Sequence, residues 1–402
     1  MSHLDESGVF DDRHILIDAC NATLTLQGTD SDRTTCIDFT SAFAAVNFGH
    51  RNPAIEDAVR GGADLAAFFY PKEAEQVAAS LCRWLGDGAT RRVLFQIGGS
   101  FAVSTALALG RRARPGRIAA ISGGFHGLGV DAFAVTSVQR EYALQDTGLA
   151  DLLDGQVMRL TPGELPSSWG DVSCLIYEPI QGANGYVPLD RDWLRALEAS
   201  AQAAGVICIA DEIQCGFFRH GDFSPALSAG LDPDVLLYGK SLTNGVFPLS
   251  AVIYRSELEA FASDRVYLAH TFQTATLGYL AADAVMTFLQ NGAMPKLCAG
   301  LSARLKGFGD LLVEEDLADD VFATGPTLSL EPLTKPSKDV QRLARRDGVV
   351  VIAGGARGER LRVAPPLTVS DEELNSGLEI LHTALAGSVT PVLPRQSTPH
   401  RL

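Results

Sequence analysis

Two ionisable side chains, Asp211 and Lys240, each follow an apolar run of the sequence. The runs at 206–210 and 235–238 are rich in aliphatic residues, which is typical of buried strands in a parallel sheet. Because open α/β sheets bind ligands at the carboxyl ends of their strands, we expect both side chains at that edge. An amine there can form a Schiff base with pyridoxal phosphate (PLP), and a carboxylate can keep the pyridine nitrogen protonated. Taken alone, either residue would more often be an ordinary loop residue.

The residues that flank these two resemble a known protein family. Residues 211–221 read D-E-I-Q-C-G-F-F-R-H-G. This stretch resembles the pattern D-E-(V/I)-Q-x-G-x-x-R-x-G of the class III (ornithine/ω-amino acid) aminotransferases, which belong to the PLP fold type I group, and Lys240 follows at the family's usual distance. The other matching segments, in chain order, are 43–53, 124–127, 178–182, 270–272 and 361–367. Each motif alone is weak, but the ordered set, which spans roughly residues 35–385, is specific.

The resemblance implies an α/β protein of PLP fold type I. Such a fold has a large domain with a mostly parallel, seven-stranded sheet covered by helices, and a smaller α+β domain built from the N- and C-terminal segments. Apolar runs that alternate with amphipathic stretches agree with this architecture. The expected strands are 93–95, 117–121, 174–177, 206–210, 235–238 and 251–254. The expected helices are 73–85, 100–113, 191–204, 276–290, 296–312 and 371–385.

The chain length of 402 residues predicts more than one structural domain. We expect residues 1–45 to form the N-terminal part of the small domain and residues 46–292 to form the large PLP-binding domain. Residues 293–385 then form the C-terminal part of the small domain. Residues 386–402 are rich in Pro, Ser and Thr without any periodicity, which predicts a disordered tail.

Two glycines and a serine, Gly98, Gly99 and Ser100, join an expected strand to an expected helix. Glycine lets the backbone approach an anion, and the free N–H groups of a first helical turn point at it. The family reads S-G-A-E-A-N-E here, so the resemblance assigns these three residues to the cofactor phosphate. Phe101 stands where a Glu is usual, and Ser104 replaces a second acid; we interpret both as changes on the helix surface or at a dimer contact.

The resemblance also implies the remaining cofactor contacts. Phe125 and Ile213 should pack on the two faces of the pyridine ring, and Gln214 should donate a hydrogen bond to its phenolic oxygen. Thr271 matches the Thr that reaches the phosphate from the neighbouring subunit, which would make the protein a homodimer with a shared active site. The predicted cofactor-binding set is completed by His126 and Glu178.

Substrate binding is predicted at Arg362, which matches the family Arg that pairs with a substrate carboxylate. Ornithine-type members mask this Arg with a Glu at the position of Ala183, whereas many pyruvate-using members have Ala. Leu128 stands where many members carry an Arg for a remote carboxylate, although diaminobutyrate-type members have an apolar residue there. We add Phe43 to the substrate-binding set. These features favour different substrates within the family.

The composition restricts the partners. A net charge of −15 disfavours nucleic acid and anionic membranes, and no apolar run reaches the length needed to span a bilayer. The seven cysteines include no C-x-x-C pair, and the N-terminus lacks the features of a secretion signal, so we expect a cytoplasmic protein. His50 and His126 have no paired spacing, so no metal site is predicted.

The sequence therefore predicts a PLP-dependent aminotransferase. It would move an amino group from an ω-amino or diamino acid (ornithine- or diaminobutyrate-like) to a 2-keto acid such as 2-oxoglutarate or pyruvate. One alternative is an aminomutase or epimerase of the same fold, which would keep a single substrate through both half-reactions. A second alternative is a non-catalytic partner protein with this fold, which the altered phosphate helix suggests.

Overall fold

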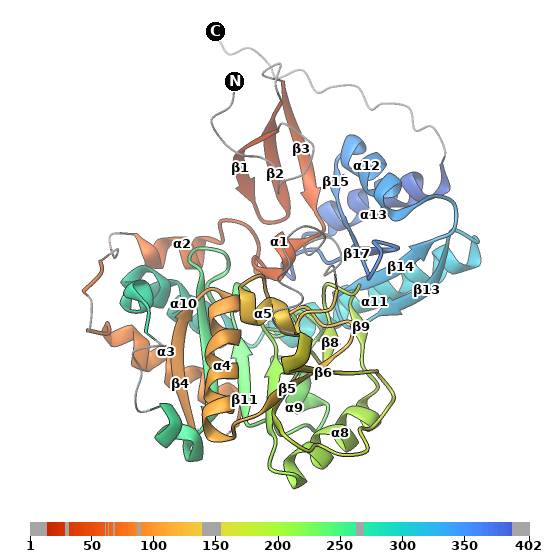
Figure 1. The fold of residues 1–402 in the computed structure, drawn as a ribbon. Helices are drawn as coiled ribbons and strands as arrows, with labels where there is room; N and C mark the ends of the chain where they lie inside the picture. The colour runs from red at the N-terminus through yellow and green to blue at the C-terminus, as the bar shows by residue number, and fades with distance from the viewer. Residues whose placement is uncertain are drawn as a thin grey trace, which may run out of the picture.

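The computed structural model describes residues 14–28, 32–60, 62, 64–66, 69–86, 90–138, 154–262 and 269–387. Its largest sheet has seven strands in the order β4-β12-β11-β10-β7-β5-β6 (Figure 1). The pairs are parallel except at β12, which runs antiparallel to both β11 and β4. The prediction of a mostly parallel, seven-stranded sheet is therefore confirmed. In sheet order the strands are Arg91–Ile97, Leu249–Arg255, Val235–Tyr238, Ile207–Asp211, Val172–Tyr177, Arg117–Ile121 and Val157–Leu160.

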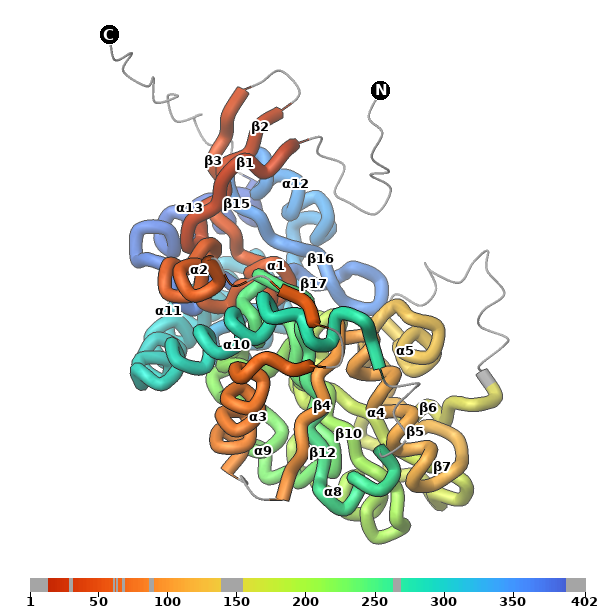
Figure 2. The backbone as a smooth tube through the Cα atoms, turned by 90° about the vertical axis from the view of Figure 1, so that its left-hand side faces the viewer, coloured from red at the N-terminus to blue at the C-terminus, as the bar shows by residue number. Residues whose placement is uncertain are grey.

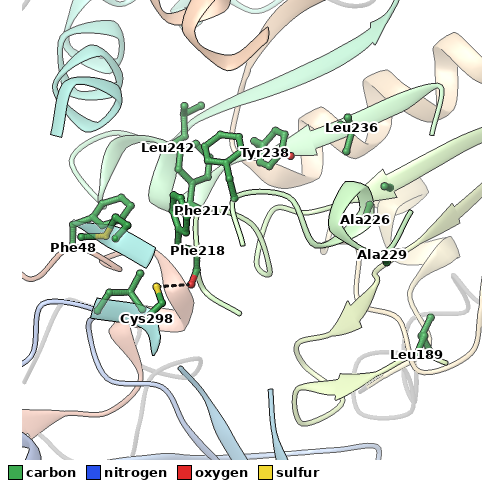
Figure 3. Packing of buried hydrophobic residues seen from close by; sticks show 14 of the residues in the cluster. Phe48, Leu189, Phe217, Phe218, Ala226, Ala229, Leu236, Tyr238, Leu242 and Cys298 are labelled. Carbon is green, nitrogen blue, oxygen red and sulfur yellow. Dashed lines mark hydrogen bonds between the residues drawn. The ribbon is translucent and has the colours of Figure 1, made fainter. Parts of the chain in front are cut away.

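Both faces of this sheet are buried. Successive residues of a strand point to opposite faces, so Ile209 and Leu237 enter one apolar cluster while Cys208 and Leu236 enter another. Figure 3 shows part of the latter cluster, where Phe217 packs on Tyr238 with ring centroids 5.5 Å apart. The first face is covered by α4 (Gly99–Ala113) and α5 (Val130–Val135). The second is covered by α3 (Lys72–Trp84), α8 (Arg191–Ala203) and α10 (Thr276–Leu289).

Two four-stranded sheets lie outside the large one, and the first of them combines the two ends of the chain. In the first sheet, β15 (Val349–Val350) pairs in parallel with β3 (Arg33–Asp38), so N- and C-terminal segments share one sheet. Figures 1 and 2 both show the N-terminal strands beside the C-terminal helices. The other strands of the first sheet are β1 (Ile15–Cys20) and β2 (Thr23–Gln27). The second sheet has the order β13-β14-β17-β16, with bounds Ala318–Ala323, Leu328–Pro332, Arg360–Val363 and Ile352–Gly354.

Three helices cover the smaller sheets. They are α11 (Met294–Glu314), α12 (Ser337–Asp347) and α13 (Asp371–Ala386). Helix α13 extends through Ala386, so it takes in the first residue of the predicted tail, and residues 388–402 lie outside the described part of the chain. The exact domain boundaries remain a prediction.

Every individually predicted strand and helix is present, with ends shifted by a few residues. Strand β10, for example, begins at Ile207 rather than Val206 and includes Asp211. Strand β6 and helix α12 were not predicted as separate elements. Strand β6 has only four residues, too few to show a period, whereas α12 is clearly amphipathic and its pattern was present in the sequence. The remaining short elements are α1 (Ser41–Ala44), α2 (Pro53–Val59), β8 (Ile180–Gln181), β9 (Val187–Pro188) and α9 (Pro225–Ser228).

Candidate functional site

Asp211 and Lys240 lie at the same edge of the large sheet. Asp211 is the last residue of β10, and Lys240 follows the neighbouring parallel strand β11, beginning the short 3₁₀ helix η2 (Lys240–Thr243). Lys240 adopts a left-handed backbone conformation with φ of +44°, which is rare for a residue with a side chain. The structure therefore places the two predicted catalytic residues together at the carboxyl ends of adjacent strands.

His126 fixes the carboxylate of Asp211. Its Nδ1 lies 2.8 Å from Asp211 Oδ2, and the backbone N–H of Ile213 donates to Oδ1 at 3.1 Å. Both His126 and Asp211 are buried. Within the described residues, His126 Nε2 is buried without a hydrogen-bond partner. The sequence analysis placed His126 in the cofactor-binding set, and in this structure its observed contact is with Asp211.

Glu178 joins two loops of the site. One carboxylate oxygen accepts a hydrogen bond from the N–H of Phe125 at 2.8 Å, and the other accepts from the N–H of Gly182 at 3.1 Å. Burial raises the pKa of Glu178 to about 7; the negative charge of Asp211 also raises it, while His126 opposes the rise. Phe125, half-buried in one of these loops, is thereby held close to Asp211 and His126.

Three charged side chains act on the amine of Lys240: Glu178, Asp211 and Arg362. Burial, the dominant cause, lowers the pKa of Lys240 to about 8, with a further lowering from Arg362. Glu178 and Asp211 act in the opposite direction and raise this pKa. A lysine with a lowered pKa has more of its neutral, nucleophilic form near neutral pH. The structure thus collects the amine, two carboxylates and the guanidinium in one electrostatically coupled site.

The predicted phosphate cradle is adjacent to this site. Gly98, the N-cap residue of helix α4, has φ of +76° and no side chain that could accept hydrogen bonds from the first-turn N–H groups. A side chain at Gly99 would come within 3.2 Å of Ile213, which places Ile213 beside the cradle. Ser100 Oγ accepts a hydrogen bond from the N–H of Leu128 at 3.2 Å. Such a helix start can bind a phosphate.

Gln214 and Phe43 contact each other in a strained turn. Ser41, Ala42, Phe43 and Ala44 all have positive φ angles, which costs roughly 1–2 kcal/mol per residue. Gln214 Nε2 donates to the carbonyl of Phe43 at 3.1 Å, and Ser241 Oγ donates to that of Ala44 at 2.6 Å. The predicted role of Gln214 toward a phenolic oxygen therefore depends on its second amide hydrogen. The Phe43 side chain is 43% exposed.

Arg362, on β17, is 3% exposed. Its Nη1 donates to the carbonyl of Gly182 at 3.0 Å, and its guanidinium lies over the ring of Tyr186 at 5.6 Å. Burial lowers its pKa. Ala183, also buried, follows Gly182, and its carbonyl accepts from Gly355 at 3.1 Å. Arg362 and Ala183 are therefore neighbours, as the sequence analysis expected.

Thr271 is not brought to these residues within the described part of the chain. It is exposed on a 3₁₀ turn, Thr271–Thr274, next to His270. Phe101 is half exposed on the surface of α4, with its ring 5.2 Å from that of His270, a position compatible with both the helix-surface and the dimer-contact interpretation. Ser104 Oγ donates to Asp131 at 2.8 Å.

Three structurally important residues were missed as site residues. Glu212, fully buried, accepts from Tyr238 Oη at 2.5 Å and from the N–H of Ala226 at 2.6 Å, and burial raises its pKa to about 7. Arg219, also buried, donates to four neutral oxygens, including the carbonyls of Pro365 and Pro326. Both lie in the 211–221 motif, so the motif itself was the available signal. Tyr186, beneath Arg362, had no signal beyond its place after Gly185.

Among the described residues, no helix is long and apolar enough to cross a membrane. The same residues contain no group of three or more His, Cys, Asp or Glu side chains that could hold a metal ion.

Comparison with known proteins gives consistent results. The family described as "Aminotransferase class-III" matches residues 19–385. The 5-aminovalerate aminotransferase of Pseudomonas putida is 27% identical over 386 residues, covering 87% of this chain and 89% of the relative. The acetylornithine aminotransferase of Lactiplantibacillus plantarum is 28% identical over 385 residues, covering 90% and 92%.

Solved structures share the fold. An amine transaminase from an uncultivated Pseudomonas species, crystallised in its PLP-bound form, has a TM-score of 0.81 at 22% identity and covers 96% of this chain and 97% of its own. The ornithine aminotransferase of Toxoplasma gondii has a TM-score of 0.80 at 21% identity and covers 95% and 93%.

Proposed function

This chain belongs to the class III aminotransferase family, and from that premise we propose that it moves an amino group between an ω-amino or diamino acid and a 2-keto acid. It is a PLP-dependent enzyme of fold type I. The observation that carries the proposal is the placement of Asp211 and Lys240 at the ends of adjacent parallel strands, with the pKa of Lys240 lowered to about 8.

The residues at this edge fit PLP as a resident cofactor. The uncapped start of α4, at Gly98, Gly99 and Ser100, supplies free N–H groups for the phosphate. Lys240 would hold PLP covalently, and Asp211 would pair with the pyridine nitrogen. When bound, PLP supplies an electron sink for the carbon that carries the amino group. Four further residues complete the proposed cofactor site: Phe125, Ile213, Gln214 and Glu178.

Lys240 is also the proposed general base. A pKa of about 8 leaves part of the amine neutral near pH 7, so it can take a proton from the substrate carbon and return it. A well-placed group of this kind contributes roughly 10²–10⁴-fold to the rate. Asp211 is oriented by His126 and presents its carboxyl group to the site.

The proposed substrates carry a carboxylate that Arg362 binds. Support comes from the relatives named above, whose amino donors are 5-aminovalerate and acetylornithine. The keto acceptor would be 2-oxoglutarate or pyruvate, because Ala183 leaves Arg362 unmasked for the carboxylate that both carry. Leu128 supplies no cation for a second carboxylate, which favours pyruvate of the two. A phenylalanine at position 43 would border the same space.

The protein is proposed to be a cytoplasmic homodimer with shared active sites. Large apolar side chains, Phe101, Leu128 and Phe272, are exposed beside the phosphate cradle, as at many interaction surfaces. Thr271 lies in the same region and would reach the partner's phosphate. None of the seven cysteines, all of which lie in the described part of the chain, is in a disulfide, in agreement with a reducing compartment.

Subunit mixing tests the shared site. Lys240→Ala and Thr271→Ala variants are refolded together, and the heterodimer is purified by two different tags. One of its two sites then has an intact Lys240 and an intact Thr271, so we expect activity above the mean of the two parents. A heterodimer no more active than that mean would place Thr271 in the site of its own subunit.

Borohydride reduction followed by peptide mapping tests the central assignment. We expect the reduced PLP label on Lys240, and we expect Lys240→Ala to lose turnover while it still binds PLP non-covalently. A label on another lysine would contradict the assignment. Donor and acceptor are then supplied as separate molecules: amino transfer between them is the expected outcome, whereas isomerisation of the donor alone would identify an aminomutase or epimerase.

A further inference from the structure

Arg362 is a buried guanidinium with few hydrogen-bond partners among the described residues. Its one described hydrogen bond is from Nη1 to the carbonyl of Gly182. Across the described residues, Nε is buried without an acceptor, and no carboxylate forms an ion pair with Arg362. A buried cation with few partners is costly. The cost is offset when a ligand carboxylate supplies the missing acceptors.

Tyr186 is an aromatic neighbour on which the guanidinium of Arg362 lies. Its side chain is 1% exposed, and Arg362 Cζ lies 5.6 Å from the centre of its ring. This geometry is that of a cation–π contact, in which the negative face of the ring attracts the cation without neutralising its charge. Arg362 is therefore held in place and remains a full positive charge.

The ring of Tyr186 is itself held by a neutral neighbour. His220 packs on it with ring centroids 5.4 Å apart. His220 Nδ1 lies 3.0 Å from the carbonyl of Thr324 and 3.1 Å from Thr327 Oγ1, and burial lowers its pKa to about 3. The imidazole thus adds no positive charge that would repel Arg362 across the ring.

Backbone on the other side closes the seat. A side chain at Gly354 would come within 2.6 Å of Arg362 Nε, so the guanidinium lies directly against the backbone of β16. Tyr186 adopts a left-handed conformation with φ of +56°, a strained position for an aromatic residue that the surrounding structure must impose. The guanidinium is fixed between Tyr186 and Gly354, and none of the described acids forms an ion pair with it, although the charge of Glu178 acts on it from a greater distance.

We propose that Tyr186 is a positioning residue that holds Arg362 as a permanently presented receptor for carboxylates. This inference rests on the proposed function and deepens it: the same guanidinium binds the carboxylate of the amino donor and that of the keto acceptor. The substrate class is then a pair of carboxylate-bearing molecules, and simple amines are poor donors, because an unmasked buried charge stays unpaired when they bind.

The test removes the π face while it keeps an apolar side chain. In the PLP-loaded enzyme, Tyr186→Leu is compared with Tyr186→Phe, which retains the ring. Dissociation constants are measured for valerate, a carboxylate without an amine, by its effect on the cofactor absorbance. Values of kcat/KM are measured for 5-aminovalerate and for butylamine, which differ only in the carboxylate.

A cation–π contact predicts a selective loss. Tyr186→Leu should weaken valerate binding and kcat/KM for 5-aminovalerate about two- to thirtyfold, and Tyr186→Phe should restore both to within about twofold. Butylamine turnover should be unchanged. Equal losses for butylamine and 5-aminovalerate, or unchanged valerate binding in a folded Tyr186→Leu protein, would overturn the proposal.

A second pair of variants covers the case in which Tyr186→Leu does not fold. Phenylalanine and pentafluorophenylalanine at position 186 have nearly the same shape, but fluorination removes the negative ring face. We expect weaker valerate binding only in the fluorinated protein; equal binding by the two proteins would overturn the role of the ring. If valerate binding depends on the ring of residue 186 but no amino donor reacts, the proposed aminotransferase function is wrong and the role of Tyr186 in carboxylate binding is kept. If amino donors react but valerate binding does not depend on the ring, the proposed function is kept and the role of Tyr186 is wrong.

Discussion

Two arginines on strand β17, Arg360 and Arg362, have opposite surroundings. They are two residues apart, so both side chains point to the same side of the strand, and each is 3% exposed. Arg360 forms ion pairs with Asp320 and Glu331, the latter at 3.4 Å, and lies 4.6 Å over the ring of Phe322. Arg362 lies over an aromatic ring and forms no ion pair with any acid among the described residues. The charge of Arg360 is neutralised by ion pairs with these two acids. The charge of Arg362 has no such ion pair among the described residues and is available to bind a ligand.

The acidic neighbours Asp211 and Glu212 form a similar contrast at the end of β10. Glu212 accepts hydrogen bonds from Tyr238 and Ala226, which lie in the core below the sheet edge. Asp211 is held by His126 at one oxygen and shares its electrostatic environment with Lys240. In each pair of like residues, one is bound by the fold and the other is oriented toward the site.

The largest effect is expected from the acidic pair. Asp211→Asn should keep the fold and bound PLP but lower kcat by more than the roughly 10²-fold that a lost proton-transfer group costs, because an amide does not keep a pyridinium protonated. Glu212→Gln should mainly lower stability, by roughly 1–3 kcal/mol, because one buried partner loses its acceptor. Steady-state kinetics and thermal unfolding of both variants separate the effects. Near-normal turnover in Asp211→Asn would show that the two acids have been assigned the wrong way round.

The arginine pair is expected to give the next effect. Arg362→Ala should reduce kcat/KM for 5-aminovalerate, with a loss of transition-state stabilisation of roughly 2–5 kcal/mol, the value for truncation of a buried charge pair. The loss for butylamine should be far smaller. Arg360→Ala should lower the free energy of unfolding by roughly 1–3 kcal/mol and leave the preference for the acid unchanged. Kinetics with both donors and urea unfolding of both variants make the comparison. Equal losses for the two donors in Arg362→Ala would give Arg362 a role in the fold.

Placing a glutamate next to Arg362 should make its surroundings resemble those of Arg360, which has acidic partners. In Ala183→Glu, the new carboxylate would follow Gly182, whose carbonyl already binds Arg362. We expect kcat/KM for 5-aminovalerate to fall, with a loss of transition-state stabilisation of roughly 1.5–3 kcal/mol, the value of a hydrogen bond to a charged group. Ala183→Gln is the control of equal shape without the charge. If the two variants lose the same amount, the effect is steric and the absence of an acid at position 183 does not control access.

The sequence was sufficient for some of these contrasts and insufficient for others. The large sheet, its strand ends and the positions of Asp211 and Lys240 were predictable, because buried strands carry continuous apolar runs and parallel strands end at a common edge. The sequence Arg-Leu-Arg at 360–362 does not show that its two arginines have different surroundings. The residues that distinguish them, Asp320, Glu331 and Tyr186, come from other strands and loops. Long-range pairing of this kind leaves no local pattern.

Lys240 extends the comparison to a third cation, which is half-buried and whose charge depends on neighbours of both signs. With a pKa of about 8, the rate of covalent PLP uptake by the cofactor-free enzyme should rise about tenfold per pH unit below pH 8 and level off above it, since only the neutral amine reacts. Arg362 lowers this pKa and Glu178 raises it. Arg362→Ala should therefore move the midpoint to higher pH, and Glu178→Gln should move it to lower pH.

Arg360→Ala is the matched control for this smallest of the expected effects. The charge of Arg360 is paired with Asp320 and Glu331, and it has no described influence on the pKa of Lys240, so the midpoint should not move. Stopped-flow absorbance after mixing apoenzyme with PLP gives the midpoint for each protein. If Arg360→Ala and Arg362→Ala shift the midpoint equally, then the ion pairs of Arg360 do not screen it from the site, and the contrast between the two arginines is one of shape rather than of available charge.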